Sequence, residues 1–467
     1  MANSNYEHGT SNIEIGQRFP LTIKRLGING EGIGYYKHTV VFVQGALPDE
    51  VVVAEVVATA PHFITAKIHK IRQQSPARVT PRDEQYGDVG GIELEHLAYP
   101  EQLKFKADVI QQALEKFRPQ GYKNYDVRPT IGMDDPYEYR NKAQFQVRQL
   151  NGHVAAGLYR KNSHDLVDLP TFSTQRPAIM TTMRYLVNLI EQLAIPVYDE
   201  TAKSGIIKTI AIRESITTGH LQVTLITNTP KLPKKHALLT AIAADLPEVT
   251  SVMQNINPGE TSLIWGEETR HLAGDTYLTE TINGYTFKLS ARAFFQLNPK
   301  QTEKLYQLAE QALNLSQHET LIDAYCGVGT LGISLADTAS EVRGMDTIPE
   351  AIADAKENAE LNQVTNAHYE VGKAEELLPQ WLREGFEPDA LIVDPPRTGL
   401  DNQLRQAILD SRPEKFVYIS CNPSTLARDL VSLVKDYRVD YIQSIDMFPQ
   451  TARVEAVVKF SKRQLYR

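Results

Sequence analysis

The sequence predicts an α/β protein with three domains: a small OB-like β-barrel, an α+β middle domain, and a C-terminal doubly wound, Rossmann-like domain. Three observations predict this fold. The 467 residues are more than one hydrophobic core usually serves. The N-terminal part consists of short apolar runs divided by glycines, which is typical of small barrels. From Leu289 onward, helical and strand-like patterns alternate, as they do in parallel sheets.

The barrel is predicted over residues 11–72, after a polar N-terminal stretch, residues 1 to about 12, for which we expect disorder. The runs 40–43, 51–53 and 64–71 are rich in β-branched residues and have the spacing of barrel strands. Five glycines separate these runs: Gly27, Gly30, Gly32, Gly34 and Gly45.

The middle domain is predicted over residues 73–284, and it begins with turn and linker residues at 73–81. Residues 101–117 carry apolar side chains at helical spacing, and this helix can pack on the C-terminal domain. A second helix is predicted at 177–193. Strands are predicted at 143–147 and 221–226.

The C-terminal domain is predicted over residues 285–467 as a parallel, doubly wound sheet. Its predicted helices are 299–313, 349–362, 402–409 and 424–434. Its predicted strands are 320–323, 341–346, 390–394, 416–420 and 454–460.

The composition indicates a soluble globular protein, with 42% hydrophobic and 23% charged residues. The chain contains no apolar run long enough to cross a membrane and no basic-then-apolar leader, so we expect neither a membrane partner nor secretion. Its only cysteines are Cys326 and Cys421. This count argues against a disulfide framework and favours a cytoplasmic location.

Two stretches of this chain of net charge −8 contain basic residues and no carboxylate. Residues 60–82 carry Lys67, Lys70, Arg72, Arg78 and Arg82, and residues 139–164 carry Arg140, Lys142, Arg148, Arg160 and Lys161. A run of like charges is often only a solvated face. Two acid-free stretches in an acidic protein nevertheless favour contact with a polyanion.

A glycine-rich loop, residues 323–332, follows a predicted strand and opens a helix. Gly327, Gly329 and Gly332 fit the pattern GxGxxG, which lets a ligand approach the backbone at a helix N-terminus. Asp346 ends the next strand, where a carboxylate can accept hydrogen bonds from ribose hydroxyls. The glycines alone do not separate a dinucleotide from S-adenosylmethionine.

Two further details favour the methyl donor. Asp323, just before the loop, suits a cationic sulfonium and amino group, whereas it would repel a pyrophosphate. Asp394-Pro395-Pro396 ends another strand, and amino-methylating enzymes carry a similar motif that ends in an aromatic residue. Arg397 takes that place here, which counts against an exocyclic amine and leaves a ring carbon as the target.

Cys421 lies in Ser420-Cys421-Asn422-Pro423, directly after the apolar run 416–419. A lone cysteine is usually a small buried hydrophobe, but active sites of open α/β sheets lie at the carboxyl ends of strands. Asp394 ends the neighbouring strand in the same way. A thiol and a carboxylate at one crevice favour covalent chemistry.

Carbon 5 of a pyrimidine is a poor nucleophile until a thiolate adds to carbon 6. This scheme needs an activated thiol and a carboxylate base that removes the carbon 5 proton. Glu455 precedes the apolar run 456–458 and can reach the same crevice, although a glutamate at a strand start is usually solvated.

These motifs together resemble the RNA 5-methyluridine methyltransferase family, and the resemblance covers almost the whole chain. It rests on the DAYCGVGTLG loop, the AFFQLN segment from Ala293 to Asn298, DPPR, SCNP and the terminal PQTARVE. The resemblance implies that Cys421 is the nucleophile and Glu455 the base. It also implies that the methyl donor S-adenosylmethionine is held by Gln296, Tyr325, Asp346 and Asp394, together with Asp323, Gly327 and Gly329 of the loop pattern.

The resemblance also implies substrate-binding residues. Phe294 would stack on or replace the extruded uracil, although a core phenylalanine is an equal alternative. Asn298, Arg140 and Lys142 would lie near the RNA. The segment from Gly27 to Glu50 resembles a TRAM module, which most relatives that act on tRNA lack, so we expect 23S rRNA as the substrate and a monomeric enzyme.

The sequence departs from the family pattern at three places. Val89-Gly90-Gly91-Ile92, with Leu94 to Leu97 after it, occupies the frame of an iron–sulfur cluster without any cysteine. Two cysteines cannot form a four-thiolate cluster, so we expect apolar packing in place of iron and no metal. Asp346 stands where glutamate is common, and Arg453 where histidine is frequent.

Three alternatives remain open. One is the same chemistry on tRNA, and the second is an NAD-linked oxidoreductase that uses the glycine loop but leaves SCNP unexplained. The third is a non-catalytic RNA-binding assembly factor, which would tolerate the loss of Cys421. The sequence does not indicate which uridine, or how many, is modified.

Overall fold

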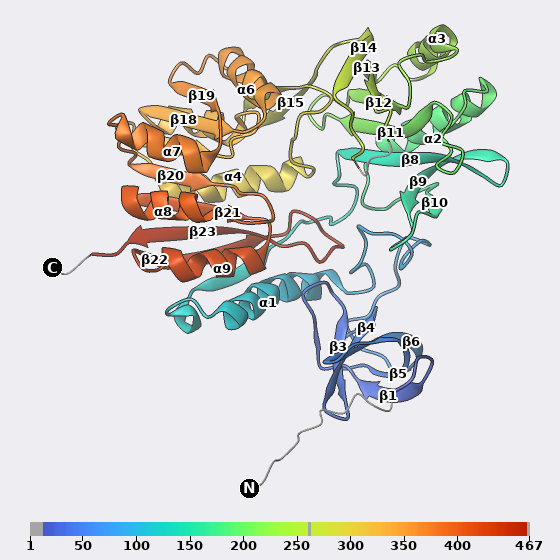
Figure 1. Ribbon diagram of the computed structural model, residues 1–467, viewed down its shortest axis with the longest axis horizontal. Helices are drawn as coiled ribbons and strands as arrows, with labels where there is room; N and C mark the ends of the chain where they lie inside the picture. Colours follow the sequence, from blue (N-terminus) through green and yellow to red (C-terminus); the bar gives the residue numbers. More distant parts are fainter. Residues whose placement is uncertain (1–12, 260–262, 465–467) are drawn as a thin grey trace.

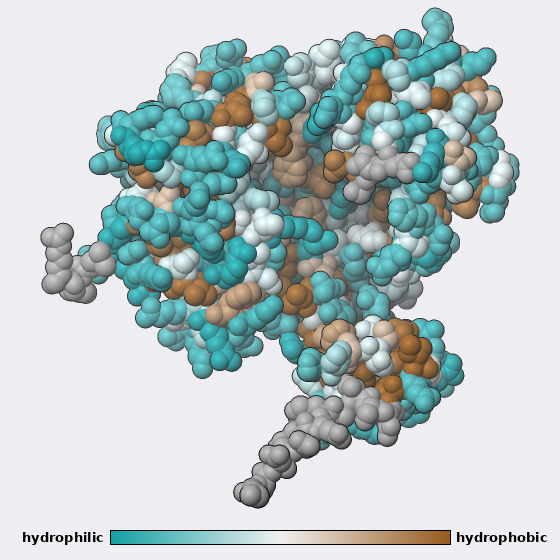
Figure 2. Space-filling model, viewed as in Figure 1, coloured by the Kyte–Doolittle hydropathy of each residue, from teal (hydrophilic) through white to brown (hydrophobic). Residues whose placement is uncertain are grey.

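A computed structural model describes residues 13–259 and 263–464, so the disorder expected for residues 1–12 lies outside the described residues. Figure 1 shows the barrel, the middle domain and the C-terminal domain as three separate blocks. The C-terminal sheet and its helices lie at the left, the middle domain at the upper right and the barrel below it. In the space-filling view the molecule is hollowed between the middle and C-terminal blocks (Figure 2). No helix of the described residues is long and apolar enough to span a membrane.

The barrel is a six-stranded sheet, and its ends meet because β1 contacts β3. Across the sheet the strands are β1 (Arg18–Thr22), β5 (Val51–Thr59), β6 (Phe63–Gln73), β4 (Thr39–Gln44), β3 (Gly32–Tyr36) and β2 (Arg25–Leu26). Two glycines of β3 are required by close packing. A Cβ atom at Gly32 would lie 2.7 Å from the Ala46 carbonyl oxygen, and one at Gly34 would lie 2.8 Å from that of Thr22.

The middle domain is a seven-stranded sheet covered by two helices. In sheet order its strands are β10 (Leu166–Asp168), β9 (His153–Tyr159), β8 (Lys142–Leu150), β11 (Ile207–Glu214), β12 (Leu221–Thr227), β13 (Val249–Ile256) and β14 (Glu268–Gly274). The helices are α2 (Pro177–Gln192) and α3 (Lys235–Asp245), and a hairpin of β15 (Leu278–Ile282) and β16 (Tyr285–Leu289) leads to the last domain. Only β12 and β13 pair in parallel.

The C-terminal domain is built on an eight-stranded sheet. Its order is β19 (Ala367–Val371), β18 (Glu341–Asp346), β17 (Thr320–Ala324), β20 (Ala390–Val393), β21 (Lys415–Ser420), β23 (Glu455–Lys462), β22 (Tyr437–Ile445) and β7 (Val127–Ile131). The first five strands are parallel, as predicted. Strand β23 is antiparallel to both of its neighbours, so the expectation of a wholly parallel sheet was wrong. The reversal arises because β22 and β23 are joined by a short loop instead of a helix.

Helices cover both faces of this sheet and enclose two hydrophobic cores. One face carries α1 (Tyr99–Phe117), α7 (Ala374–Arg383), α8 (Asn402–Ser411) and α9 (Pro423–Leu433). The other carries α4 (Pro299–Leu313), α5 (Thr330–Leu335) and α6 (Pro349–Leu361). Helix α1 packs on α9 and β7. The structure therefore places α1 and β7 in the C-terminal domain, whereas the predicted boundary assigned both to the middle domain.

Candidate active site

Three strand ends bring a thiol and two carboxylates to one edge of the C-terminal sheet. Strands β20 and β21 are parallel neighbours, so Asp394 and Cys421 both leave the sheet at its carboxyl edge. Strand β23 is antiparallel and pairs Ala456 with Ser420, which brings Glu455, at the start of that strand, to the same edge. This edge faces the middle domain (Figure 1). The thiol of Cys421 donates a hydrogen bond to the Pro395 carbonyl oxygen at 3.8 Å.

Asn422, which follows the cysteine, has a structural role that accounts for its place in the motif. The Asn422 side chain accepts a hydrogen bond from the Ser424 N–H and caps α9, with Pro423 in the first turn. Its amide also donates to the Arg397 carbonyl at 2.8 Å. The segment after β20 and the segment after β21 are therefore tied together by Asn422.

The surroundings of the site disfavour the negatively charged forms of its thiol and carboxyl groups. The pKa of the half-buried Cys421 thiol is raised to about 11 by burial and by the carboxylates of Glu455 and Asp394. Arg397 has a smaller, opposite effect. Burial and Asp394 raise the pKa of Glu455 to about 8, and burial raises that of Asp394 to about 7. The expectation of an activated thiol is therefore wrong for the protein without ligands.

The glycine-rich loop adopts left-handed backbone at Tyr325, Gly327 and Gly329. A Cβ at Gly329 would approach the Tyr369 hydroxyl to 3.0 Å, whereas at Gly327 it would meet nothing within 4 Å. Gly327 therefore borders open space, as a residue at a ligand cradle should. Its N–H donates to Asp346 at 3.1 Å.

The two aspartates that flank this loop have different roles. Asp346 is partly exposed, and its second carboxylate oxygen accepts the Ile348 N–H at 3.0 Å. Asp323 is 2% exposed and accepts the Gly332 N–H at 2.9 Å, so it supports the loop from within instead of facing a ligand. Burial raises the pKa of Asp323 to about 7. A concentration of carboxylates suits a cationic methyl donor better than a pyrophosphate, so the residues present fit S-adenosylmethionine.

The segment from Ser290 to Asn298 lies beside the site, with Ala291, Ala293 and Phe295 buried in the core. The buried Arg213 guanidinium donates to the Ser290 and Ala293 carbonyls at 3.4 and 2.5 Å. The Asn141 N–H donates to the Leu297 carbonyl at 3.0 Å. Phe294 is 70% exposed, which excludes a core role for it.

Gln296 and Asn298, in the same segment, differ in what they can bind. The half-buried Gln296 side chain forms no hydrogen bond within the described residues. Asn298 is buried, accepts the Gln301 N–H as the cap of α4, and donates to the Met447 carbonyl at 3.1 Å and to the Met133 sulfur. Its predicted substrate contact is replaced by a structural role, because its amide is consumed inside the protein.

Arg140 and Lys142 flank Asn141 and thus lie near the same segment. The Arg140 guanidinium lies 6.0 Å from the Phe448 ring centroid. Lys142 lies 5.2 Å from the ring centroid of Trp265, which sequence reasoning did not single out. Burial and Arg213 lower the pKa of Lys142 to about 6, and no carboxylate offsets this effect. An anion beside Lys142 would supply the missing opposite charge.

The acid-free stretches of the sequence are only partly acid-free in space. Four of their basic residues pair with carboxylates from elsewhere: Lys67 with Glu55, Arg78 with Glu50, Arg148 with Glu200 and Arg160 with Asp88. The positive surface is therefore smaller than the sequence indicates.

The segment that lacks the cluster cysteines is packed with apolar side chains. Val89 and Ile92 are fully buried in the core of the middle domain, while Leu94 and Leu97 join the core of the C-terminal domain. Among the described residues, no group of three or more His, Cys, Asp or Glu is placed to hold a metal ion.

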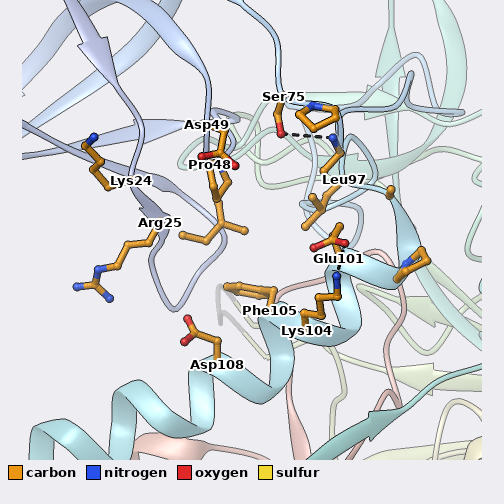
Figure 3. Close-up of a pocket in the computed structure, with 15 residues that line it drawn as sticks. Lys24, Arg25, Pro48, Asp49, Ser75, Leu97, Glu101, Lys104, Phe105 and Asp108 are labelled. Carbon is orange, nitrogen blue, oxygen red and sulfur yellow. Dashed lines mark hydrogen bonds and ion pairs between the residues drawn. The ribbon is translucent and has the colours of Figure 1, made fainter.

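A groove of about 590 Å³ lies elsewhere, between the barrel and α1 (Figure 3). Its lining includes Lys24, Arg25 and Asp49 of the barrel and Lys104 and Asp108 of α1. It contains neither the thiol nor the carboxylates of the strand ends.

Comparisons with known proteins identify the family of this chain. The family described as tRNA (Uracil-5-)-methyltransferase matches residues 267–463, and the TRAM domain matches residues 13–69. A protein of Lactiplantibacillus plantarum named "Uncharacterized RNA methyltransferase" is 69% identical over 97% of this chain and 94% of its own length. One of Enterococcus faecalis with the same name is 54% identical over 97% of this chain and 99% of its own.

A solved structure is similar over nearly the whole chain. It is the Pyrococcus abyssi tRNA (uracil-54, C5)-methyltransferase in complex with S-adenosyl-L-homocysteine. The two are 27% identical, with a TM-score of 0.76, over 94% of this chain and 99% of that one.

Proposed function

The chain belongs to the RNA uracil-C5 methyltransferase family, and we propose that it methylates carbon 5 of uridine in 23S rRNA through a transient bond between Cys421 and the uracil ring. The observation that carries this proposal is the meeting of Cys421, Asp394 and Glu455 at one sheet edge, beside the glycine-rich loop. Dependence on S-adenosylmethionine follows from the family.

Cys421 and Glu455 divide the chemistry between them. The Cys421 thiol releases its proton to solvent and the thiolate adds to carbon 6. The electron pair of the 5,6 double bond then moves into an enolate whose carbon 5 is nucleophilic. When bound, the donor would supply an electrophilic methyl group to carbon 5 and would leave as S-adenosyl-L-homocysteine. Glu455 then removes the carbon 5 proton, the electrons of that C–H bond restore the 5,6 double bond, and the Cys421 thiolate leaves.

The donor would be held by residues around the glycine-rich loop. Gln296 offers an uncommitted amide, Asp346 and Asp394 offer carboxylates at strand ends, and Tyr325 lies at the end of β17. The open space at Gly327 leaves room for a ligand against the backbone. Gly329 supports the loop from its packed side.

The RNA would bind across the hollow between the middle and C-terminal domains. The exposed Phe294 would stack on the extruded uracil or fill its place in the RNA. Arg140 and Lys142 would contact phosphates. This assignment is supported by Lys142, beside Trp265, because no carboxylate of the described residues offsets the lowering of its pKa and a phosphate would do so. We further propose that the enzyme acts as a monomer without an iron–sulfur cluster.

The TRAM barrel supports rRNA, but a second candidate is tRNA. The Pyrococcus abyssi protein, named as a tRNA enzyme, matches 94% of this chain, and that share must include much of the barrel. The barrel alone therefore does not separate the two substrates. Assays with purified 23S rRNA and with tRNA, both lacking 5-methyluridine, would do so. Methylation of tRNA alone would overturn the rRNA assignment while leaving the chemistry intact.

Replacing Cys421 tests the chemistry. We expect Cys421→Ala to lower turnover by at least about 10⁴-fold and to abolish covalent capture of RNA that carries 5-fluorouridine, whose carbon–fluorine bond the base cannot break. Binding of the donor should persist. The matched control is Cys326→Ala, because Cys326 is the other cysteine and lies buried. Methylation retained in Cys421→Ala would overturn the adduct mechanism.

A further inference from the structure

The loop between β22 and β23 has no regular secondary structure, yet its backbone is held carbonyl by carbonyl. The carbonyl oxygens of five consecutive residues, 446–450, each accept a hydrogen bond from a group outside the loop. The donors are Gln301 Nε2 to Asp446, Asn298 Nδ2 to Met447, Lys106 Nζ to Phe448, the Tyr139 hydroxyl to Pro449, and the Leu94 N–H to Gln450. The donors come from α1, α4, the cap of α4 and two connecting segments.

Lys106 makes the most unusual of these contacts. Its side chain and that of Asp446 are both 0% exposed and form an ion pair, while Lys106 also donates to the Phe448 carbonyl at 2.9 Å. One turn earlier in α1, Gln102 binds Gln450 twice, through the Gln450 side chain at 2.9 Å and its N–H at 3.0 Å. Helix α1 thus binds both ends of the segment 446–450, Asp446 through Lys106 and Gln450 through Gln102.

A buried ion pair is an inefficient way to gain stability, because desolvation offsets most of the attraction. A buried pair that also orders a loop can nevertheless fix geometry. The loop held here leads directly to Glu455, five residues beyond Gln450. Burial lowers the pKa of Lys106, against the opposite effect of Asp446, Glu93 and Glu455. The charged and titratable groups that act on Glu455 are Asp394, Arg397 and Lys106.

We propose that Lys106 is a positioning residue for the proton-abstracting step: through Asp446 and Phe448 it holds the loop 446–450, which leads to Glu455. This inference rests on the proposed role of Glu455 as the base. Loss of Lys106 would leave the nucleophile and the donor site in place but would displace the base and weaken its ionisation.

The test follows the covalent RNA–protein adduct in single-turnover reactions with labelled methyl donor and RNA. In Lys106→Met we expect methyl transfer to persist, while decay of the methylated adduct on a denaturing gel slows by about tenfold or more. The acid limb of the pH profile for decay should move to higher pH, because Lys106 lowers the pKa of Glu455 and its removal raises it. Lys104→Met is the control, since Lys104 lies on the same helix with its side chain 73% exposed.

A second variant covers failure of Lys106→Met to fold, because that change leaves Asp446 buried without its partner. Lys106→Met combined with Asp446→Asn removes both charges and should fold, yet it should still accumulate the adduct. Normal adduct decay with an unchanged pH profile in either folded variant would overturn the inference.

Glu455→Gln separates this inference from the proposed function. If Glu455→Gln traps the adduct and the Lys106 variants release it normally, only the inference fails. If Glu455→Gln releases RNA at the normal rate, the role of Glu455 itself is wrong.

Discussion

The two segments that flank the strand-end site differ in how completely their groups are held by the rest of the protein. In the loop 446–450 every backbone carbonyl accepts a hydrogen bond from another part of the chain. In the segment 290–298 the backbone is held by Arg213 and Asn141, but Phe294 projects into solvent and the Gln296 side chain has no partner within the described residues.

This difference matches what each segment has to do. A base must be held within a fraction of an ångström of its proton, so the structure that carries it is fixed before substrate arrives. Residues that take up a donor and an extruded base must first admit them. We therefore expect changes in the fixed loop to alter stability and chemistry, and changes in the open segment to alter binding.

The largest effect should come from the buried charge at the end of the fixed loop. Because the pKa of Glu455 is raised from 4.5 to about 8, the folded protein keeps a proton that the unfolded chain loses between those values. The free energy of unfolding should therefore fall as pH rises through this range.

Glu455→Gln should remove the contribution of this carboxyl group to the pH-dependent fall in the free energy of unfolding, which is on the order of 3–5 kcal/mol. Denaturant unfolding of both proteins at several pH values measures it, with Glu115→Gln at an exposed position of α1 as the control. Parallel curves for the Glu455→Gln variant and the unaltered protein would show that the buried charge carries no such cost.

A smaller effect is expected at Asn298, which joins the two segments. Asn298→Ala removes the cap of α4 and leaves the Met447 carbonyl without its donor, which should cost about 2–3 kcal/mol of stability. RNA affinity should stay within about twofold, measured by filter binding below the melting temperature. Weaker RNA binding at unchanged stability would instead restore Asn298 as a substrate contact and blur the comparison.

The smallest free-energy change is expected at Phe294. Stacking of one base on an aromatic side chain is worth about 1–3 kcal/mol, so Phe294→Ala should lower kcat/KM for RNA by about 5- to 150-fold. The melting temperature should not change, because the ring is 70% exposed. Leu361→Ala, at another exposed apolar position, is the control. A large drop in melting temperature would mean that the open segment is a structural element.

Much of the fold could be predicted from local patterns of apolar residues. The apolar runs at 320–323, 390–394 and 416–420 correspond to strands, because central parallel strands are buried on both faces and lack alternation. The reversed direction of β23, and the addition of β7 from a distant part of the chain, could not be predicted from such patterns. Strand direction and partner choice depend on long-range packing, which leaves no mark on local spacing.

The candidate site shows the same division. Sequence pattern predicted the strand-end positions of Cys421 and Asp394 and allowed Glu455 to reach the same crevice. The role of Glu455 as the base was implied by the family resemblance. The raised pKa of the thiol did not follow, because it depends on burial and on carboxylates that are distant in sequence. Lys106 was also missed, although its place between buried positions of α1 was a usable signal: a lysine on the apolar face of a helix needs a buried partner.

The reversed direction of β23 has a practical consequence. The strand starts at Glu455 on the edge that carries the thiol and ends at Lys462, paired with Tyr437, on the opposite edge. A purification handle or surface tether fused downstream of Lys462 would leave the sheet on the side away from the reacting groups. Immobilisation through that end should thus spare both donor uptake and RNA entry.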